Sequence, residues 1–114
     1  MPETVAGRNE RLNDYIADIT AISLHTGVPN DSGSNEVTGG APAYARKTPA
    51  YSAASAGATN LTASLVFDIP TGVTVQYYGL WKSTTFLGYE PLSANEAFAA
   101  QGTYTLTSAA ITAP

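Results

Sequence analysis

Two neighbouring runs decide the fold class of this chain: Leu61-Thr62-Ala63-Ser64-Leu65-Val66-Phe67 and Val73-Thr74-Val75-Gln76-Tyr77-Tyr78-Gly79-Leu80-Trp81. Apolar and polar residues alternate in both, which is typical of a β-strand with one buried face. Pro70-Thr71-Gly72 supplies a turn between them, so the runs are predicted to pair as an antiparallel hairpin. The alternation in the second run predicts that Tyr78 lies on the outer face and that the following residues point inward: Val73, Val75, Tyr77 and Trp81.

Further short strands are predicted on both sides of this hairpin. Residues 21–26 form one, with Ile22 and Leu24 inward, and residues 84–89 and 103–107 form two more. Residues 91–96 are expected to be a loop or a single helical turn, and residues 109–112 to close the sheet. Residues 42–48 are read as an extended edge segment flanked by prolines. So many short strands predict a mainly β fold, an antiparallel β-sandwich or barrel-like domain.

One amphipathic helix is predicted at the N-terminus, over residues 3–19. Its apolar stripe comprises Val5, Leu12, Ile16 and Ile19. Residues 27–40 are rich in Gly, Pro, Asn, Asp and Ser and form a long loop, either functional or pinned against a neighbour. The chain of 114 residues is therefore expected to be a single β-rich domain, 1–114, with a strand-rich core at 59–112.

The composition excludes several classes of protein. Only 12% of residues are charged and 44% are hydrophobic, which predicts a folded chain with a largely uncharged surface. There is no cysteine, and the net charge of -4 argues against binding nucleic acid. No secretion signal and no apolar stretch of about 20 residues is visible, so membrane insertion is not expected.

Residues suited to catalysis or metal binding are sparse. His25 is the only histidine, and a triad with Asp31 and a serine lacks the Gly-x-Ser-x-Gly elbow that would support it. We interpret His25 as the end of a strand, bonded to a nearby backbone group. Asp31, Asn35 and Glu36 are oxygen ligands that could hold calcium, but without the regular spacing of a calcium loop. The sequence therefore predicts no catalytic residues, no metal ligands, no cofactor and no enzymatic activity, and whether residues 27–40 bind an ion stays open.

Aromatic and basic residues near strand edges are the candidates for contacts with other subunits or with a receptor. Tyr44 and Tyr51 flank loops, Tyr78 is predicted to face outward, and aromatic residues are enriched at interfaces. Arg46 and Lys47 are the only adjacent basic residues. The predicted contact residues are Tyr44, Arg46, Lys47, Tyr51 and Tyr78.

Several short motifs, taken in order, resemble a family of short proteins of actinobacterial tailed phages, described as tail fibre or minor tail proteins. They are Ser23-Leu24-His25-Thr26 with Pro29, residues 35–40, residues 42–47, Val66-Phe67-Asp68-Ile69-Pro70 with Gly72, Tyr78-Gly79-Leu80-Trp81, Phe86-Leu87-Gly88 and Gln101-Gly102-Thr103-Tyr104. The resemblance implies a structural protein of the virion, synthesised in the host cytoplasm and bound to other tail or capsid subunits. The resemblance implies no catalytic residues.

The leading hypothesis is accordingly a tail-associated, fibre-like structural subunit that assembles in multiple copies, as a homo-oligomer. Uncharged Thr, Ser, Ala and Gly surface supports assembly because it is buried at little desolvation cost. A protein that decorates the capsid and a module that binds a host receptor or carbohydrate are the alternatives.

Overall fold

The N-terminal helix is confirmed by a computed structural model that describes residues 4–112. Helix α1 (Val5–Asp18) begins at Thr4, whose side chain accepts a hydrogen bond from the Gly7 backbone at 3.1 Å. Leu12 is its buried residue, whereas Val5 is 48% exposed, so the predicted stripe is wrong at its first member. Asn9 and Asn13 accept hydrogen bonds from backbone amides of the 54–57 turn, which fixes the helix beside it.

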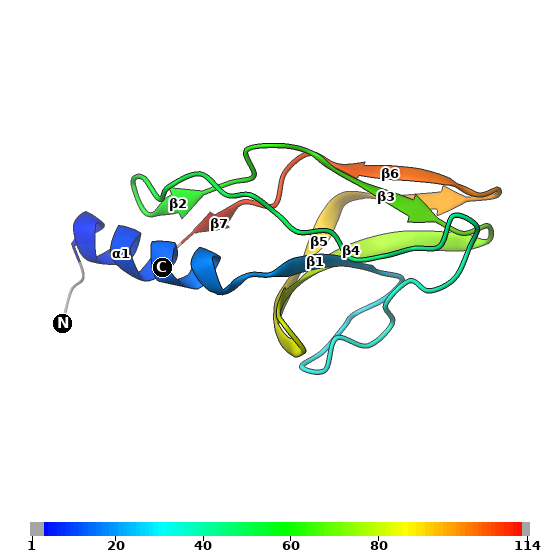
Figure 1. The fold of residues 1–114 in the computed structure, drawn as a ribbon, viewed down its shortest axis with the longest axis horizontal. Coiled ribbons are helices and arrows are strands. Elements are labelled where there is room, and N and C mark those ends of the chain that lie inside the picture. The colour runs from blue at the N-terminus through cyan, green and yellow to red at the C-terminus, as the bar shows by residue number, and fades with distance from the viewer. Residues whose placement is uncertain (1–3, 113–114) are drawn as a thin grey trace.

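Residues 4–112 also contain seven strands, and every pairing between them is antiparallel. They are β1 (Ala21–His25), β2 (Ala58–Thr59), β3 (Leu65–Ile69), β4 (Val73–Lys82), β5 (Thr85–Phe98), β6 (Gly102–Leu106) and β7 (Ile111–Thr112). One sheet has the order β1-β4-β5 and a second pairs β3 with β6. Figure 1 shows these as two layers, which confirms the predicted mainly β, sandwich-like fold.

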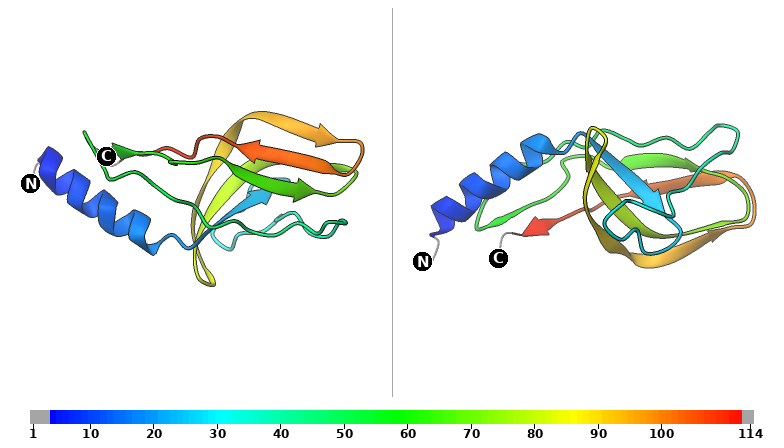
Figure 2. Two further views of the ribbon diagram at one scale, coloured as in Figure 1. Left: turned by 45° about the horizontal axis from the view of Figure 1, so that its top comes forward. Right: turned by 90° about the horizontal axis from the view of Figure 1, so that it is seen from below.

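The small β2-β7 ladder lies beyond the sandwich, at the end that carries α1. Residues 58 and 59 pair with Thr112 and Ile111, so the C-terminal strand joins this ladder rather than either main sheet. In Figure 2, α1, β2 and β7 project together from one end of the sandwich, and the molecule measures 49 × 26 × 24 Å. None of the helices among residues 4–112 is long and apolar enough to cross a membrane.

The predicted hairpin between residues 61–67 and 73–81 is wrong. β3 pairs with β6, in a register that places Val66 opposite Thr105, while β4 pairs with β1 and β5. The turn at Thr71 and Gly72 carries the chain from one sheet to the other. The two runs therefore face each other across the core, where Phe67 and Val75 are both fully buried. Burial of apolar area is the dominant favourable term in folding, and this arrangement buries the apolar faces of both strands against each other.

The face assigned to Tyr78 is also wrong, because β4 is irregular. Its pairing with β5 shifts between Val75 and Tyr77 and again between Leu80 and Trp81. A β-bulge changes which side chains point to which face. As a result Tyr78 and Leu80 join Val75 in the core, and Tyr78 is only 6% exposed. Trp81 is buried as well, but on the opposite face of the sheet.

β5 is longer than predicted, and residues 91–96 are strand rather than loop or helical turn. The strand continues through Pro91, which pairs with Tyr77. Proline lacks a backbone donor, yet it is tolerated at the edge of a sheet, and β5 is an edge strand in the order β1-β4-β5. Pro91 is thus a poor indicator of a strand end.

Candidate functional site

A buried polar network covers the outer face of the β1-β4-β5 sheet. The Trp81 indole N–H donates to Ser23 Oγ at 2.8 Å, and Ser23 Oγ lies 2.6 Å from His25 Nε2. His25 Nδ1 lies 2.8 Å from the Ser34 carbonyl oxygen. A carbonyl can only accept, so Nδ1 carries the proton and Nε2 accepts from Ser23. These bonds pin the predicted 27–40 loop against β1, and they confirm that His25 ends a strand and bonds a backbone group.

Ser23 and His25 resemble a catalytic pair only in their spacing. Both residues are 0% exposed, and the Ser23 hydroxyl already bonds Trp81 and His25. A nucleophile must reach a substrate atom, and a fully covered hydroxyl does not. The pair therefore acts structurally, joining β1 to β4 and to the loop above them.

Removing the Ser23 hydroxyl is expected to destabilise the fold. Ser23→Ala leaves two buried partners, Trp81 Nε1–H and His25 Nε2, without a hydrogen bond, at a cost of about 1–3 kcal/mol for each orphaned group. Urea unfolding followed by the fluorescence of Trp81, the only tryptophan in the chain, measures the loss. Ser64→Ala, at an exposed serine, is the matched control. Equal stabilities of the two variants would contradict the role of the network.

Burial lowers the pKa of His25, while its bond to Ser34 and the charge of Glu36 oppose that shift. The unfolded chain then binds more protons than the folded one over the pH range between the two pKa values. The free energy of unfolding is therefore expected to fall as the pH drops through about 6.5, the ordinary histidine value. Urea titrations across this range measure the slope, which His25→Gln should abolish. A wild-type slope in the His25→Gln variant would contradict this assignment.

Glu36 organises an ion-pair cluster at the rim of the network. Arg46 donates two hydrogen bonds to its carboxylate, at 2.9 and 2.8 Å, and the Tyr44 hydroxyl donates a third at 2.9 Å. Burial would raise the pKa of Glu36, but these bonds outweigh it and lower the pKa overall. The Arg46 guanidinium also lies 3.7 Å above the centroid of the Trp81 ring, a cation–π contact. The cluster ties residues 36–46 onto β4.

The structure brings together two of the five predicted contact residues, Tyr44 and Arg46. Tyr44 is half-buried, and its oxygen also accepts from the Leu24 amide at 2.9 Å. Lys47 pairs its backbone with that of Ile22, which places Lys47 at the outer edge of β1. Tyr51 donates to the Ala109 carbonyl at 3.1 Å. A contact role for these residues stays a prediction.

Of the residues proposed to hold an ion in the loop, Glu36 and Asn35 have protein partners. The Glu36 carboxylate binds Arg46 and Tyr44, and the Asn35 side-chain amide donates to the Val28 carbonyl at 3.1 Å. Within residues 4–112, no three His, Cys, Asp or Glu side chains are grouped as a metal site. Gly33 allows the loop to pack closely on Trp81. Its φ is +73°, a conformation that favours glycine, and a Cβ at this position would lie only 2.6 Å from the Trp81 ring.

The sequence did not predict that Ser23, Gly33 and Trp81 form one cluster. They lie far apart along the chain, and only the pairing of β1 with β4 brings Ser23 and Trp81 together. The available signal was weak: a serine between two inward-facing apolar residues, and a tryptophan at the end of a strand. Neither pattern indicates which residues share a face.

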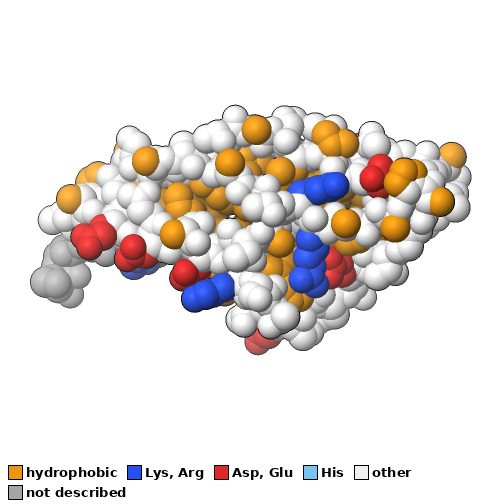
Figure 3. Space-filling model, viewed as in Figure 1, with side chains coloured by type: hydrophobic (Ala, Val, Ile, Leu, Met, Phe, Trp, Pro, Cys, Tyr) orange, Lys and Arg blue, Asp and Glu red, His pale blue; other side chains and the backbone are white. Residues whose placement is uncertain are grey.

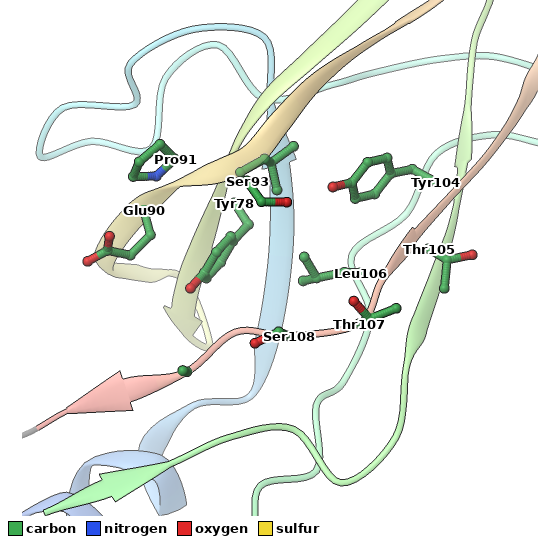
Figure 4. A pocket seen from close by; sticks show the side chains of 11 residues that line it. Tyr78, Glu90, Pro91, Ser93, Tyr104, Thr105, Leu106, Thr107 and Ser108 are labelled. Atoms are coloured by element: carbon green, nitrogen blue, oxygen red, sulfur yellow. The ribbon is translucent and has the colours of Figure 1, made fainter.

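An open groove separates the edge of β5 from β6. It encloses about 430 Å³, and Figure 4 shows the rings of Tyr78 and Tyr104 around Leu106, with Glu90 and Ser93 on the β5 side. Burial raises the pKa of Tyr78 to about 12, so its hydroxyl is protonated at neutral pH. The groove walls thus consist mainly of uncharged side chains.

Charge is distributed unevenly over the molecule. Residues 48–67 and 97–114 contain no Asp, Glu, Lys or Arg. These segments hold β2, β6, β7 and most of β3. In Figure 3 the charged side chains gather over α1 and around the middle of the molecule, while the upper margin carries uncharged ones. The surface that β2, β6, β7 and most of β3 offer to a protein partner is therefore largely neutral.

A family model described as podophage GP4 fiber I protein gp80 matches residues 17–113, which is most of the chain. This chain belongs to that phage fibre family. Membership in the gp80 family implies a structural protein of the virion that associates with other virion proteins, and it supports a tail-associated role. A search of curated proteins gave no match. The gp80 match confirms the phage fibre part of the resemblance, whereas an actinobacterial origin and the description as a minor tail protein stay predictions.

Proposed function

We propose that this gp80-family protein is a non-enzymatic structural subunit of a phage tail fibre, present in several copies per particle. The observation that carries the proposal is the family match over residues 17–113. The buried Ser23–His25 pair supports a structural rather than a catalytic use of the chain's polar residues. Only 12% of residues are charged, so covering much of this surface by neighbouring subunits costs little desolvation.

A labelled antibody against the chain, imaged on purified particles by electron microscopy, tests the proposed location. We expect label on the tail. Label spread over the head would instead support the capsid decoration alternative, and particles without label and without the chain would contradict a virion role altogether. Particles of an unrelated phage that lacks this gene provide the control for antibody specificity.

A further inference from the structure

The groove between β5 and β6 carries negative charge that no basic side chain balances. Glu90 lines it, and within residues 4–112 no Lys, Arg or His does. Glu96, on the same strand, acts on the groove as well: burial raises the pKa of Tyr104, and the charge of Glu96 raises it further. Neither glutamate forms an ion pair in the described part of the chain. The groove therefore presents a negative potential to whatever enters it.

The hydroxyl of Tyr78 is a second unpaired group at this groove. The residue is only 6% exposed, yet its hydroxyl makes no hydrogen bond with any residue that the structure describes. No side-chain oxygen that is completely covered in residues 4–112 lacks a partner, so this hydroxyl is reachable from the groove that Tyr78 lines. Figure 4 shows its ring between Glu90 and Leu106. A bound group would meet a phenol oxygen and a carboxylate together.

A ligand of this groove has to match both its charge and its aromatic rings. An anion is repelled by the two glutamates, and an apolar group would displace water from Glu90 without offering a hydrogen bond in return. A neutral sugar would bond the oxygens but leave the carboxylate charge in place. An arginine guanidinium does both, because it carries five N–H donors and a positive charge, and its plane stacks on aromatic faces such as those of Tyr78 and Tyr104.

The arginines of this chain already have partners. Arg46 donates two hydrogen bonds to Glu36, and Arg8 and Arg11 also interact with other parts of the chain. The sequence contains no further arginine. A second copy would have to break one of these contacts to supply a guanidinium, whereas a different protein with an exposed arginine would not.

We propose that the groove between β5 and β6 binds an arginine side chain of a neighbouring virion protein, with the guanidinium beside Glu90 and stacked on the tyrosine rings. The inference rests on the proposed function, in which the chain associates with other virion proteins. It deepens that function by naming the surface used and the chemistry of the partner. Arginine is also among the residues enriched at protein interfaces.

Titration of the full-length chain with a short peptide, followed by nuclear magnetic resonance, tests this groove. The probe is the capped peptide Gly-Ser-Arg-Ser-Gly, and its control replaces arginine with citrulline, the neutral isostere. The arginine peptide is expected to shift the amide signals of residues 90–93 and 104–108, and the citrulline peptide to bind more weakly. Glu90→Gln should weaken binding of the arginine peptide about fivefold, as expected when an exposed ion pair is lost. Asp14→Asn, which removes an exposed charge on α1, should bind like wild type.

Three results would overturn the inference. The citrulline peptide could bind as tightly as the arginine peptide, Glu90→Gln could leave the affinity unchanged, or the groove signals could stay in place up to about 10 mM peptide, the limit of weak binding. Stronger binding of a neutral oligosaccharide, maltoheptaose, at the same signals would also contradict it and identify a sugar site. Each of these outcomes leaves the proposed function intact. Absence of the chain from purified particles would overturn that function while the peptide result stands.

Discussion

Replacing Phe67 with alanine is expected to lower the free energy of unfolding by about 3–5 kcal/mol, the usual cost of a large buried aromatic truncation. Phe67 is fully buried in the core between the two sheets, and its ring stacks on Tyr44 at a centroid distance of 6.2 Å. The truncation removes apolar contacts and leaves a cavity in close-packed surroundings. Urea unfolding followed by circular dichroism measures the difference.

Val28→Ala is the control for this prediction, because Val28 lies in the loop and is 42% exposed. Its effect should stay within about 0.5 kcal/mol, as for most surface substitutions. A similar small effect for Phe67→Ala would mean that the two sheets do not share one core. The facing arrangement of β3 and β4 would then be contradicted.

Truncation of Trp81 is expected to be comparably costly, about 3–5 kcal/mol for Trp81→Ala. The indole ring is buried on the outer face of the sheet, where Phe86 packs edge-on at 5.0 Å and Gly33 lies against it. Its loss also deprives Ser23 of a donor and Arg46 of the ring beneath its guanidinium. Circular dichroism again provides the readout, since the variant has no tryptophan fluorescence.

Trp81→Phe keeps part of the packing at this position. It retains one aromatic ring but loses the indole N–H, whose hydrogen bond contributes about 0.5–1.5 kcal/mol, and some of the ring area against Gly33, so the expected cost lies between that value and the loss for Trp81→Ala. Equal losses for Trp81→Ala and Trp81→Phe would show that the hydrogen bond, and not the packed ring, fastens the loop. That outcome would contradict the larger contribution expected from the packed ring.

The class of this fold could be predicted from its sequence because class depends on local pattern. The alternation in residues 61–67 and 73–81 identified strands, although the first strand begins only at Leu65, and the stripe that includes Leu12 identified the helix. Alternation does not reveal which strands pair. Two consecutive strands with apolar faces satisfy the same pattern whether they lie side by side in one sheet or face each other across the core, as β3 and β4 do.

The site was less predictable, for reasons visible in individual residues. The bulge that brings Tyr78 into the core depends on how β4 meets β5, which no local signal encodes. The hydrogen bond between His25 and a backbone group was predictable, since a lone histidine at a strand end usually bonds the backbone. Its partners Ser23 and Ser34 follow from the fold of the loop, and the need for Gly33 follows from the position of Trp81.

The most direct test of the central claim is the copy number of this chain in purified, intact particles, measured by quantitative mass spectrometry with an isotope-labelled standard of the chain. A fibre subunit built to be covered by its neighbours should be present in several copies per particle, in a constant ratio to the other tail proteins. Particles that carry no copy of the chain, or a single one, would contradict the account.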